Sequence, residues 1–311
     1  MFPNIHTLVL TEVPLTESLA RAWYDFLLGI VRLEIPIELE SLELQELCSK
    51  DDDEDDDNDP ILILLDPSKG LVDLFVDQCG MTYSMELWEH LCPNHLTLRR
   101  FVNHSRFYDD DRTHDWIDSP DMMIEEEDRD EMWERPFLNP LYVLDLEFIG
   151  LSCDPTILIE VLYTFTKKSC LKVIHVRQSK KTARLAGSWA IASRPSNFTT
   201  WPGPVLLGFE DDEDSPKQYL NNGFPRFLEW AFEPHGIKSL EYVVFGDFAR
   251  PERYLSLNLL FCRNEGETRV FRAIKESSAG PEWKQVMKEY GNALMSCPLE
   301  PPFQVPRPNA P

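Results

Sequence analysis

Two short stretches of the sequence hold residue types that could bind a metal ion. His90, Cys92 and His95 lie within EHLCPNH, and imidazole and thiolate groups are common zinc ligands. A zinc site needs a fourth ligand in tetrahedral geometry, and Pro93-Asn94 in the middle of the stretch is a turn signal. We therefore interpret EHLCPNH as a helix end followed by a turn, with no metal bound.

The second stretch, YDDDRTHD at 108–115, offers carboxylate oxygens, which are the ligands that calcium prefers. It lacks the central glycine and the regularly spaced ligands of a calcium-binding loop, so we interpret it as a solvated loop. The sequence also lacks the motifs GxSxG, GxxxxGKS/T, GxGxxG and HExxH. We expect no catalytic residues, no cofactor and no enzymatic activity.

The charge of the protein is concentrated in three acidic runs. Eight acids at 51–59, thirteen acids and two bases at 108–134, and five acids at 210–214 account for the whole net charge of −24. Because no basic surplus is left elsewhere, we do not expect binding to nucleic acid phosphates. The same runs could attract a basic protein, so an acidic chaperone or decoy is the alternative function.

The remaining composition bears on where the protein works. No segment approaches the roughly 20 apolar residues of a membrane-spanning helix, and the first residues do not resemble a secretory signal. The seven cysteines are scattered without a CxxC pair, as reduced thiols in apolar surroundings often are. We predict a cytoplasmic or nuclear protein that has no disulfide framework and does not bind membranes.

A repeated strand pattern, apolar-x-x-apolar-x-apolar, predicts the elements that would position a binding site. The pattern starts at positions 5, 39, 71, 98, 141, 171 and 240, and four of the six intervals lie near 30 residues. This spacing is slightly longer than that of most leucine-rich repeats. Helical patterns lie between several of the strands, for example after Asp154-Pro155, so the strands should be parallel and joined by crossovers.

We predict an α/β fold, in which residues 1–248 form an irregular leucine-rich-repeat-like solenoid of short parallel strands and crossover helices. A doubly wound parallel sheet is the alternative. The three acidic runs would then be insertions, and we expect mobile loops at 51–59 and 109–134 because they carry few apolar anchors.

The end of the chain departs from the repeat. Residues 254–263 and 269–274 are strand-like and are separated by NEGET, which predicts a hairpin. Apolar residues from Trp283 to Leu294 recur at helical spacing. Hairpin and helix together would form a carboxyl-terminal cap at 249–298. The proline-rich tail at 299–311 is predicted to be disordered.

The segment from Trp230 to Asn264, WAFEPHGIKSLEYVVFGDFARPERYLSLNLLFCRN, resembles the carboxyl-terminal portion of fungal F-box proteins. In that family an irregular leucine-rich region ends in a similar series of Trp-Ala-Phe, Gly-Asp-Phe, Arg-Tyr and Cys-Arg groups. The later Ser296-Cys297-Pro298 fits the same series. The resemblance implies a substrate receptor for ubiquitin ligation whose repeats bind the target protein. It also implies a structural role for Gly246, which would allow a tight turn.

The F-box of that family is an amino-terminal helical module that binds a Skp-type adaptor. In this sequence Met1 is followed almost at once by a strand pattern, with no Leu-Pro-rich helical segment before it. We therefore interpret the chain as the target-binding portion of an F-box-like receptor. We do not expect this chain alone to bind the adaptor directly.

The candidate binding surface is the strand face that alternates with the core positions. Successive side chains of a strand point to opposite faces, so the residues between the apolar positions should face solvent. Their mixture of aromatic, aliphatic and charged side chains suits a protein partner. We predict the following partner-binding residues: Phe75, Arg100, Val102, Asp145, Glu147, His175, Arg177 and Tyr242.

Overall fold

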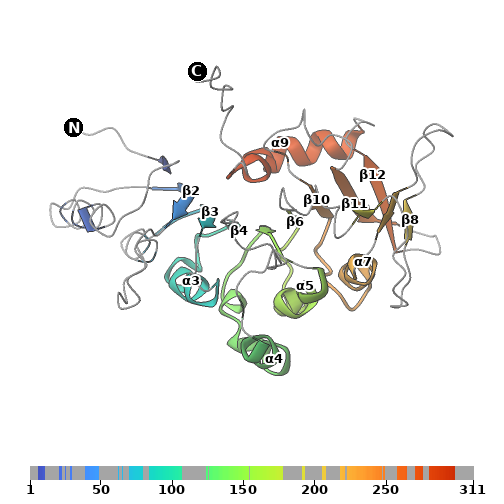
Figure 1. Cartoon of the computed structure of the whole chain (residues 1–311), viewed down its shortest axis with the longest axis horizontal. Coiled ribbons are helices and arrows are strands. Elements are labelled where there is room, and N and C mark those ends of the chain that lie inside the picture. The colour runs from blue at the N-terminus through green and yellow to red at the C-terminus, as the bar shows by residue number, and fades with distance from the viewer. Residues whose placement is uncertain are drawn as a thin grey trace, which may run out of the picture.

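The fold is α/β, built on a nine-stranded, mostly parallel sheet with helices on both faces (Figure 1). The computed structural model describes residues 6–10, 39–48, 70–79, 84–106, 126–153, 155–177, 191–192, 205–207, 218–220, 223–246, 258–264, 270–275 and 280–297, with single positions at 21, 22, 25, 29, 62, 65, 124 and 248. The acidic runs 51–59 and 210–214 and the tail 299–311 lie outside the described residues.

The strands of this sheet stand in the order in which they occur in the chain, apart from a short excursion before β10. A doubly wound sheet would instead reverse its strand order part-way across. The parallel strands are β1 (Thr7–Leu10), β2 (Ser41–Cys48), β3 (Asp73–Cys79), β4 (Arg100–Arg106), β5 (Phe148–Leu151), β6 (Val173–Val176) and β10 (Tyr242–Phe245).

Two antiparallel strands extend the sheet beyond β10, namely β11 (Leu259–Arg263) and β12 (Phe271–Lys275). They confirm the predicted hairpin. The excursion before β10 forms a separate small sheet in the order β7-β9-β8. Its strands are β7 (Ile191–Ala192), β8 (Val205–Leu207) and β9 (Gln218–Leu220).

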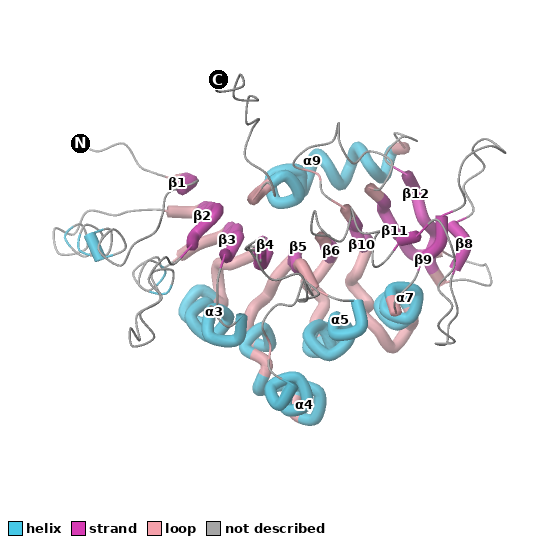
Figure 2. The backbone as a smooth tube through the Cα atoms, in the orientation of Figure 1, coloured by secondary structure: helices cyan, strands magenta, loops and turns pink. Residues whose placement is uncertain are grey.

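Among the helices whose bounds the structure describes, four lie on one face of the large sheet and a fifth lies on the other, as can be followed in Figure 2. The first four are α3 (Ser84–Leu91), α4 (Glu126–Glu134), α5 (Pro155–Leu162) and α7 (Phe224–Phe232), and the fifth is α9 (Pro281–Met295). Prolines stand in the first turn of α5, α7 and α9, where a missing N–H costs nothing. Short 3-10 turns complete the connections: η1 (Cys92–Asn94), η2 (Pro136–Leu138), η3 (Pro140–Tyr142) and η4 (Tyr163–Lys167).

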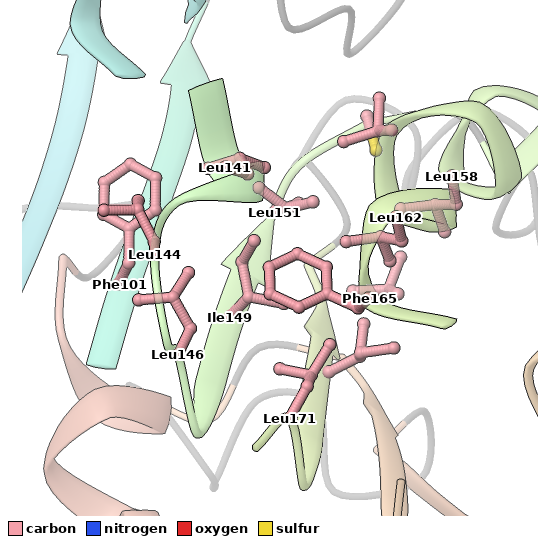
Figure 3. Packing of buried hydrophobic residues seen from close by; sticks show 14 of the residues in the cluster. Phe101, Leu141, Leu144, Leu146, Ile149, Leu151, Leu158, Leu162, Phe165 and Leu171 are labelled. Carbon is pink, nitrogen blue, oxygen red and sulfur yellow. The ribbon is translucent and has the colours of Figure 1, made fainter. Parts of the chain in front are cut away.

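The apolar positions of the strand pattern build the core between the sheet and these four helices. The strand register aligns Leu42, Leu74, Phe101, Ile149 and Ile174 in one row, and all five are fully buried. Figure 3 shows part of this core, where Leu158, Leu162 and Phe165 pack against the strands. A buried leucine of this kind contributes roughly 1.5–3 kcal/mol through the hydrophobic effect.

The fifth strand begins later than its predicted frame. Leu141, Leu144 and Leu146 are buried as the pattern requires, but β5 starts at Phe148, and Phe101 pairs with Ile149. The Asn139 side chain accepts a hydrogen bond from the Leu141 N–H and so starts η3. A 3-10 turn also buries every third residue, so the pattern alone does not distinguish turn from strand.

Part of the acidic stretch at 108–134 is helical, which corrects the prediction of a loop for its last residues. Residues 126–134, EEDRDEMWE, form α4, whose Met132 is buried. Glutamate favours helices, and the ion pair between Arg135 and Glu131 spans one helical turn. The remaining acidic residues, at 108–123 and 125, lie outside the described residues.

The helix α9 confirms the predicted helix. It folds back over the face of the sheet opposite the other helices, where it contacts β4 and β5, and its Glu282 also pairs with Arg272 of β12. Gly246 has a φ of 128°, and a Cβ atom there would lie 2.1 Å from Asn258 Oδ1. Only glycine fits this turn, which leads the chain away from β10 beneath α9.

Candidate interaction surface

Half of the predicted partner-binding residues are buried beneath α9. Phe75 is 4% exposed, and Val102, His175 and Arg177 are fully buried, so the expectation that they face solvent is wrong. The strand alternation does place them on the face away from the four helices, where Trp283, Val286, Tyr290, Ala293 and Leu294 of α9 cover them. The prediction assigned these residues to the correct face of the sheet. It did not include the helix α9 that covers this face.

Aromatic rings fill the contact between α9 and the sheet. Phe148 stacks on Tyr290 with 5.6 Å between ring centroids, and Phe248 lies 5.6 Å from Trp283. His175 packs edge-on against Phe248, and its Nε2–H donates a hydrogen bond of 2.8 Å to the Gly246 carbonyl. His175 is therefore a packing residue of this contact, not a surface ligand.

The carboxyl end of α9 is held to the sheet by a buried arginine. Arg177 Nη1 donates to the carbonyls of Ser296 (3.0 Å) and Cys297, and it lies 2.6 Å from His104 Nδ1. Because a guanidinium group only donates, His104 Nδ1 must accept and carries no proton. The Cys297 N–H donates to Glu43 Oε1 at 2.7 Å. We call this group the Arg177 anchor; its members are Glu43, His104, Arg177, Ser296 and Cys297.

The Arg177 anchor gives the Ser-Cys-Pro motif a structural role that the sequence did not reveal. Cys297 has a φ of 50°, in the left-handed region that few non-glycine residues adopt, and its Sγ lies 3.8 Å from the Leu44 carbonyl. Contacts with β2, β4 and β6 therefore meet at one turn of the chain. In the sequence, this turn is marked only by the Ser-Cys-Pro motif. The motif does not indicate which residues of the strands it contacts.

The other predicted residues border a strip that α9 leaves partly open. Arg100, Glu147 and Tyr242 are half-buried, and Asp145 is exposed. Arg100, Glu147 and Tyr242 lie at or just before the first residues of parallel strands, so they follow the amino-terminal edge of the sheet. We call this the amino-edge strip and define it as Asp73, Arg100, Glu147, Lys172, Glu241 and Tyr242.

Backbone hydrogen bonds hold the amino-edge strip in order. The Glu147 N–H donates to the Arg99 carbonyl, Lys172 to Glu147, and Glu241 to Lys172, at 2.8, 2.9 and 2.8 Å. Each strand entry is thereby fixed to the next. The side chains on this backbone are positioned by the sheet rather than by flexible loops, as a recognition surface requires.

Charges of both signs alternate along the amino-edge strip. Arg100 binds Asp73 in a bidentate manner, at 2.5 Å from Nε to Oδ1 and 2.9 Å from Nη2 to Oδ2. Burial raises the pKa of Asp73, while the hydrogen bond from Arg100 lowers it. Lys172 Nζ lies 3.7 Å from Glu147 Oε2 in an exposed pair. Burial also raises the pKa of the Tyr242 phenol, which stays protonated at neutral pH.

Asp145 stands apart from the amino-edge strip because β5 begins three residues after it. Its carboxylate lies 3.6 Å from Lys168 Nζ, and its carbonyl accepts a hydrogen bond from Arg99. Both partners belong to the turns between strands. Asp145 is therefore tied to these turns and not to the strand entries that form the amino-edge strip.

The stretch EHLCPNH ends α3 and forms η1, and its candidate ligands turn toward the backbone. His90 Nδ1 lies 3.0 Å from the Glu86 carbonyl, His95 Nδ1 lies 2.9 Å from the Cys92 carbonyl, and Cys92 Sγ approaches the Trp88 carbonyl. Burial raises the pKa of the Cys92 thiol. Among the described residues, no group of three or more His, Cys, Asp or Glu side chains is arranged to hold a metal ion.

In the part of the chain that the structure describes, no helix is long and apolar enough to cross a membrane. Comparison of the chain with family models, curated proteins and solved structures yielded no match.

Proposed function

We propose that this chain is a non-catalytic protein-interaction scaffold of the cytoplasm or nucleus, the target-binding portion of an F-box-like substrate receptor. The fold would be an irregular leucine-rich-repeat-like solenoid, closed at one end by the β11–β12 hairpin. The sequential order of the parallel strands supports this proposal, since stacked repeats place each strand beside the next in the chain.

The amino-edge strip is the observation on which the proposal depends. It crosses the sheet from β3 to β10 and combines an aromatic side chain with charges of both signs. Charged side chains on a fixed backbone select a partner by electrostatic complementarity, and Tyr242 offers an apolar anchor beside them. The target would lie along the amino-terminal edge, because α9 covers Phe75, Val102 and Phe148 on this face.

A fusion experiment tests this function directly. We would join the F-box of an unrelated receptor to this chain, reconstitute the ligase with its Skp-type adaptor, and identify ubiquitylated proteins by mass spectrometry. The double variant Tyr242→Ala/Glu241→Lys should lower ubiquitylation of a true target by about tenfold, as expected for loss of an interface anchor. The matched control is Lys284→Glu, on the exposed side of α9.

The outcome of this experiment separates the alternatives. Equal ubiquitylation by the wild-type and the double-variant fusions, both with unchanged thermal melts, would contradict the proposed surface. Binding that disappears between low and moderate salt concentrations would favour the acidic-chaperone function, because exposed charges are screened by salt. In the described residues that alternative is supported by α4, which has six acids in nine residues.

A further inference from the structure

Most of the exposed apolar side chains gather in one short segment. Among the described residues, eight large hydrophobic side chains are exposed, and five of them lie in the stretch from the last turn of α4 to the start of β5. Monomeric proteins rarely leave such a concentration uncovered without a partner. We call these five the 133–143 patch: Trp133 (50% exposed), Phe137 (63%), Leu138 (39%), Tyr142 (41%) and Val143 (44%).

The backbone beneath the 133–143 patch is fixed. The buried Asn139 donates from Nδ2 to the Val161 carbonyl at 2.8 Å and accepts from the Leu141 N–H at 2.9 Å. Met132 anchors the end of α4 in the core. Because these contacts hold the segment, the exposure of its side chains is not a result of local fraying. A fixed apolar surface binds a partner with little loss of conformational entropy.

The five side chains extend from α4 along η2 and η3. The Trp133 ring lies 5.1 Å from the ring of Tyr163, and Lys168 Nζ lies 5.6 Å from the centre of the Tyr142 ring. Figure 1 shows α4 on the outer side of α3 and α5, far from α9. The 133–143 patch is thus a different surface from the amino-edge strip, and an inference about it goes beyond the proposed function.

Negative charge borders the apolar side chains on the side of α4. Glu127, Asp130, Glu131 and Glu134 of α4 are all exposed, and Glu131 is paired with Arg135. A second copy of this chain is an unfavourable occupant, because a two-fold interface would bring the same acidic side chains together. A cationic partner is attracted instead, and its ammonium or guanidinium groups can also stack on the Trp133 ring.

We propose that the 133–143 patch docks a basic amphipathic segment of another protein, one that alternates Leu or aromatic side chains with Lys or Arg. The apolar side chains of the segment cover Trp133 and Phe137, and its cations meet the carboxylates of α4. This combination of apolar contact and charge distinguishes the docking site from the purely electrostatic attraction of an acidic run.

Titration with a model peptide tests the proposal. The probe is a fluorescein-labelled peptide of repeated Leu-Lys-Lys-Leu units, and the control peptide replaces each Leu with Ser. Trp133→Ser/Phe137→Ser should weaken binding of the Leu-Lys peptide by at least about tenfold. The matched control, Val9→Ser/Met295→Ser, removes exposed apolar side chains elsewhere and should change binding by less than about twofold.

Several results would overturn the proposal. Equal affinity for the two peptides, or unchanged affinity of Trp133→Ser/Phe137→Ser, would show that the 133–143 patch is not the site. A wild-type dimer in light scattering that this variant dissociates would identify a second copy as the occupant. Residues 180–184 of this chain, KKTAR, are basic. Tighter peptide binding by Lys180→Ser/Lys181→Ser/Arg184→Ser would identify these residues as the occupant of the patch. Tyr242→Ala/Glu241→Lys should leave peptide binding unchanged, which separates this proposal from the proposed function.

Discussion

The two faces of the large sheet are built in different ways. The face toward α3, α5 and α7 is packed by the connections between strands, and the buried cluster described there is aliphatic and aromatic. The face toward α9 is covered by one helix from the far end of the chain and contains the buried Arg177 anchor. In the first core each covering helix lies in the chain between two strands of the sheet, whereas the second requires residues 43 and 297 to meet.

This difference indicates how each face contributes to stability. Apolar packing tolerates many side chains of similar volume, so the helix-side core selects for size and hydrophobicity. Buried polar contacts tolerate few alternatives, because an unpaired donor or acceptor costs more than the hydrogen bond contributes. The Arg177 anchor therefore specifies where α9 ends, in addition to any stability that it provides.

The largest effect is expected from emptying the helix-side core. Leu146→Ala should lower the free energy of unfolding by about 2–5 kcal/mol, since Leu146 is fully buried in the main cluster. Chemical denaturation measures the change. Leu294→Ala, which is equally buried under α9, is the comparison. Its main effect should be faster amide hydrogen exchange within α9, with slower exchange retained in β3 to β6. Uniform loss of protection in both variants would show that the two faces unfold as one unit.

A smaller effect is expected from the Arg177 anchor. Arg177→Met keeps most of the side-chain volume but removes the donors to the Ser296 and Cys297 carbonyls. The free energy of unfolding should fall by about 1–3 kcal/mol, the cost of leaving buried acceptors unpaired. Arg226→Ala, an exposed arginine on α7, is the control and should change stability by less than about 0.5 kcal/mol. If Arg177→Met melts like wild type and keeps α9 protected from exchange, packing alone holds the helix.

The smallest effect concerns pH. Burial, with Glu147 and Glu289 as further contributors, raises the pKa of Tyr290 from its ordinary value near 10 to about 12. The unfolded state therefore loses this proton first, and stability should fall as the pH rises above about 10. The loss attributable to Tyr290 is about 1 kcal/mol at about pH 11. Tyr290→Phe keeps the stacked ring and should lack this component when denaturation is compared at about pH 8 and about pH 11. An identical pH dependence in both proteins would show that the phenol is solvated.

The sequence contained enough information to place most of the sheet. The apolar spacing around Leu42, Leu74, Phe101 and Ile174 is a local property of the sequence. Because side chains alternate along a strand, the adjacent residues in the sequence are enough to assign each side chain to one face of the sheet. Six of the seven predicted strand frames agree with the observed strand register. The predicted hairpin and the predicted last helix are also present. The fifth frame differs because a 3-10 turn at Pro140 satisfies the same apolar spacing.

Tertiary structure alone decided which side chains remain at the surface. Phe75, Val102, His175 and Arg177 occupy positions that solvent would reach if the sheet face were open, and nothing near them in sequence indicates a cover. The cover comes from α9, more than a hundred residues beyond Arg177, and its placement depends on contacts made only after the chain has folded. The spacing of apolar residues determines toward which face of the sheet a side chain points, because this direction depends on local strand geometry. The solvent exposure of that side chain depends on every residue that contacts it, including residues distant in the chain.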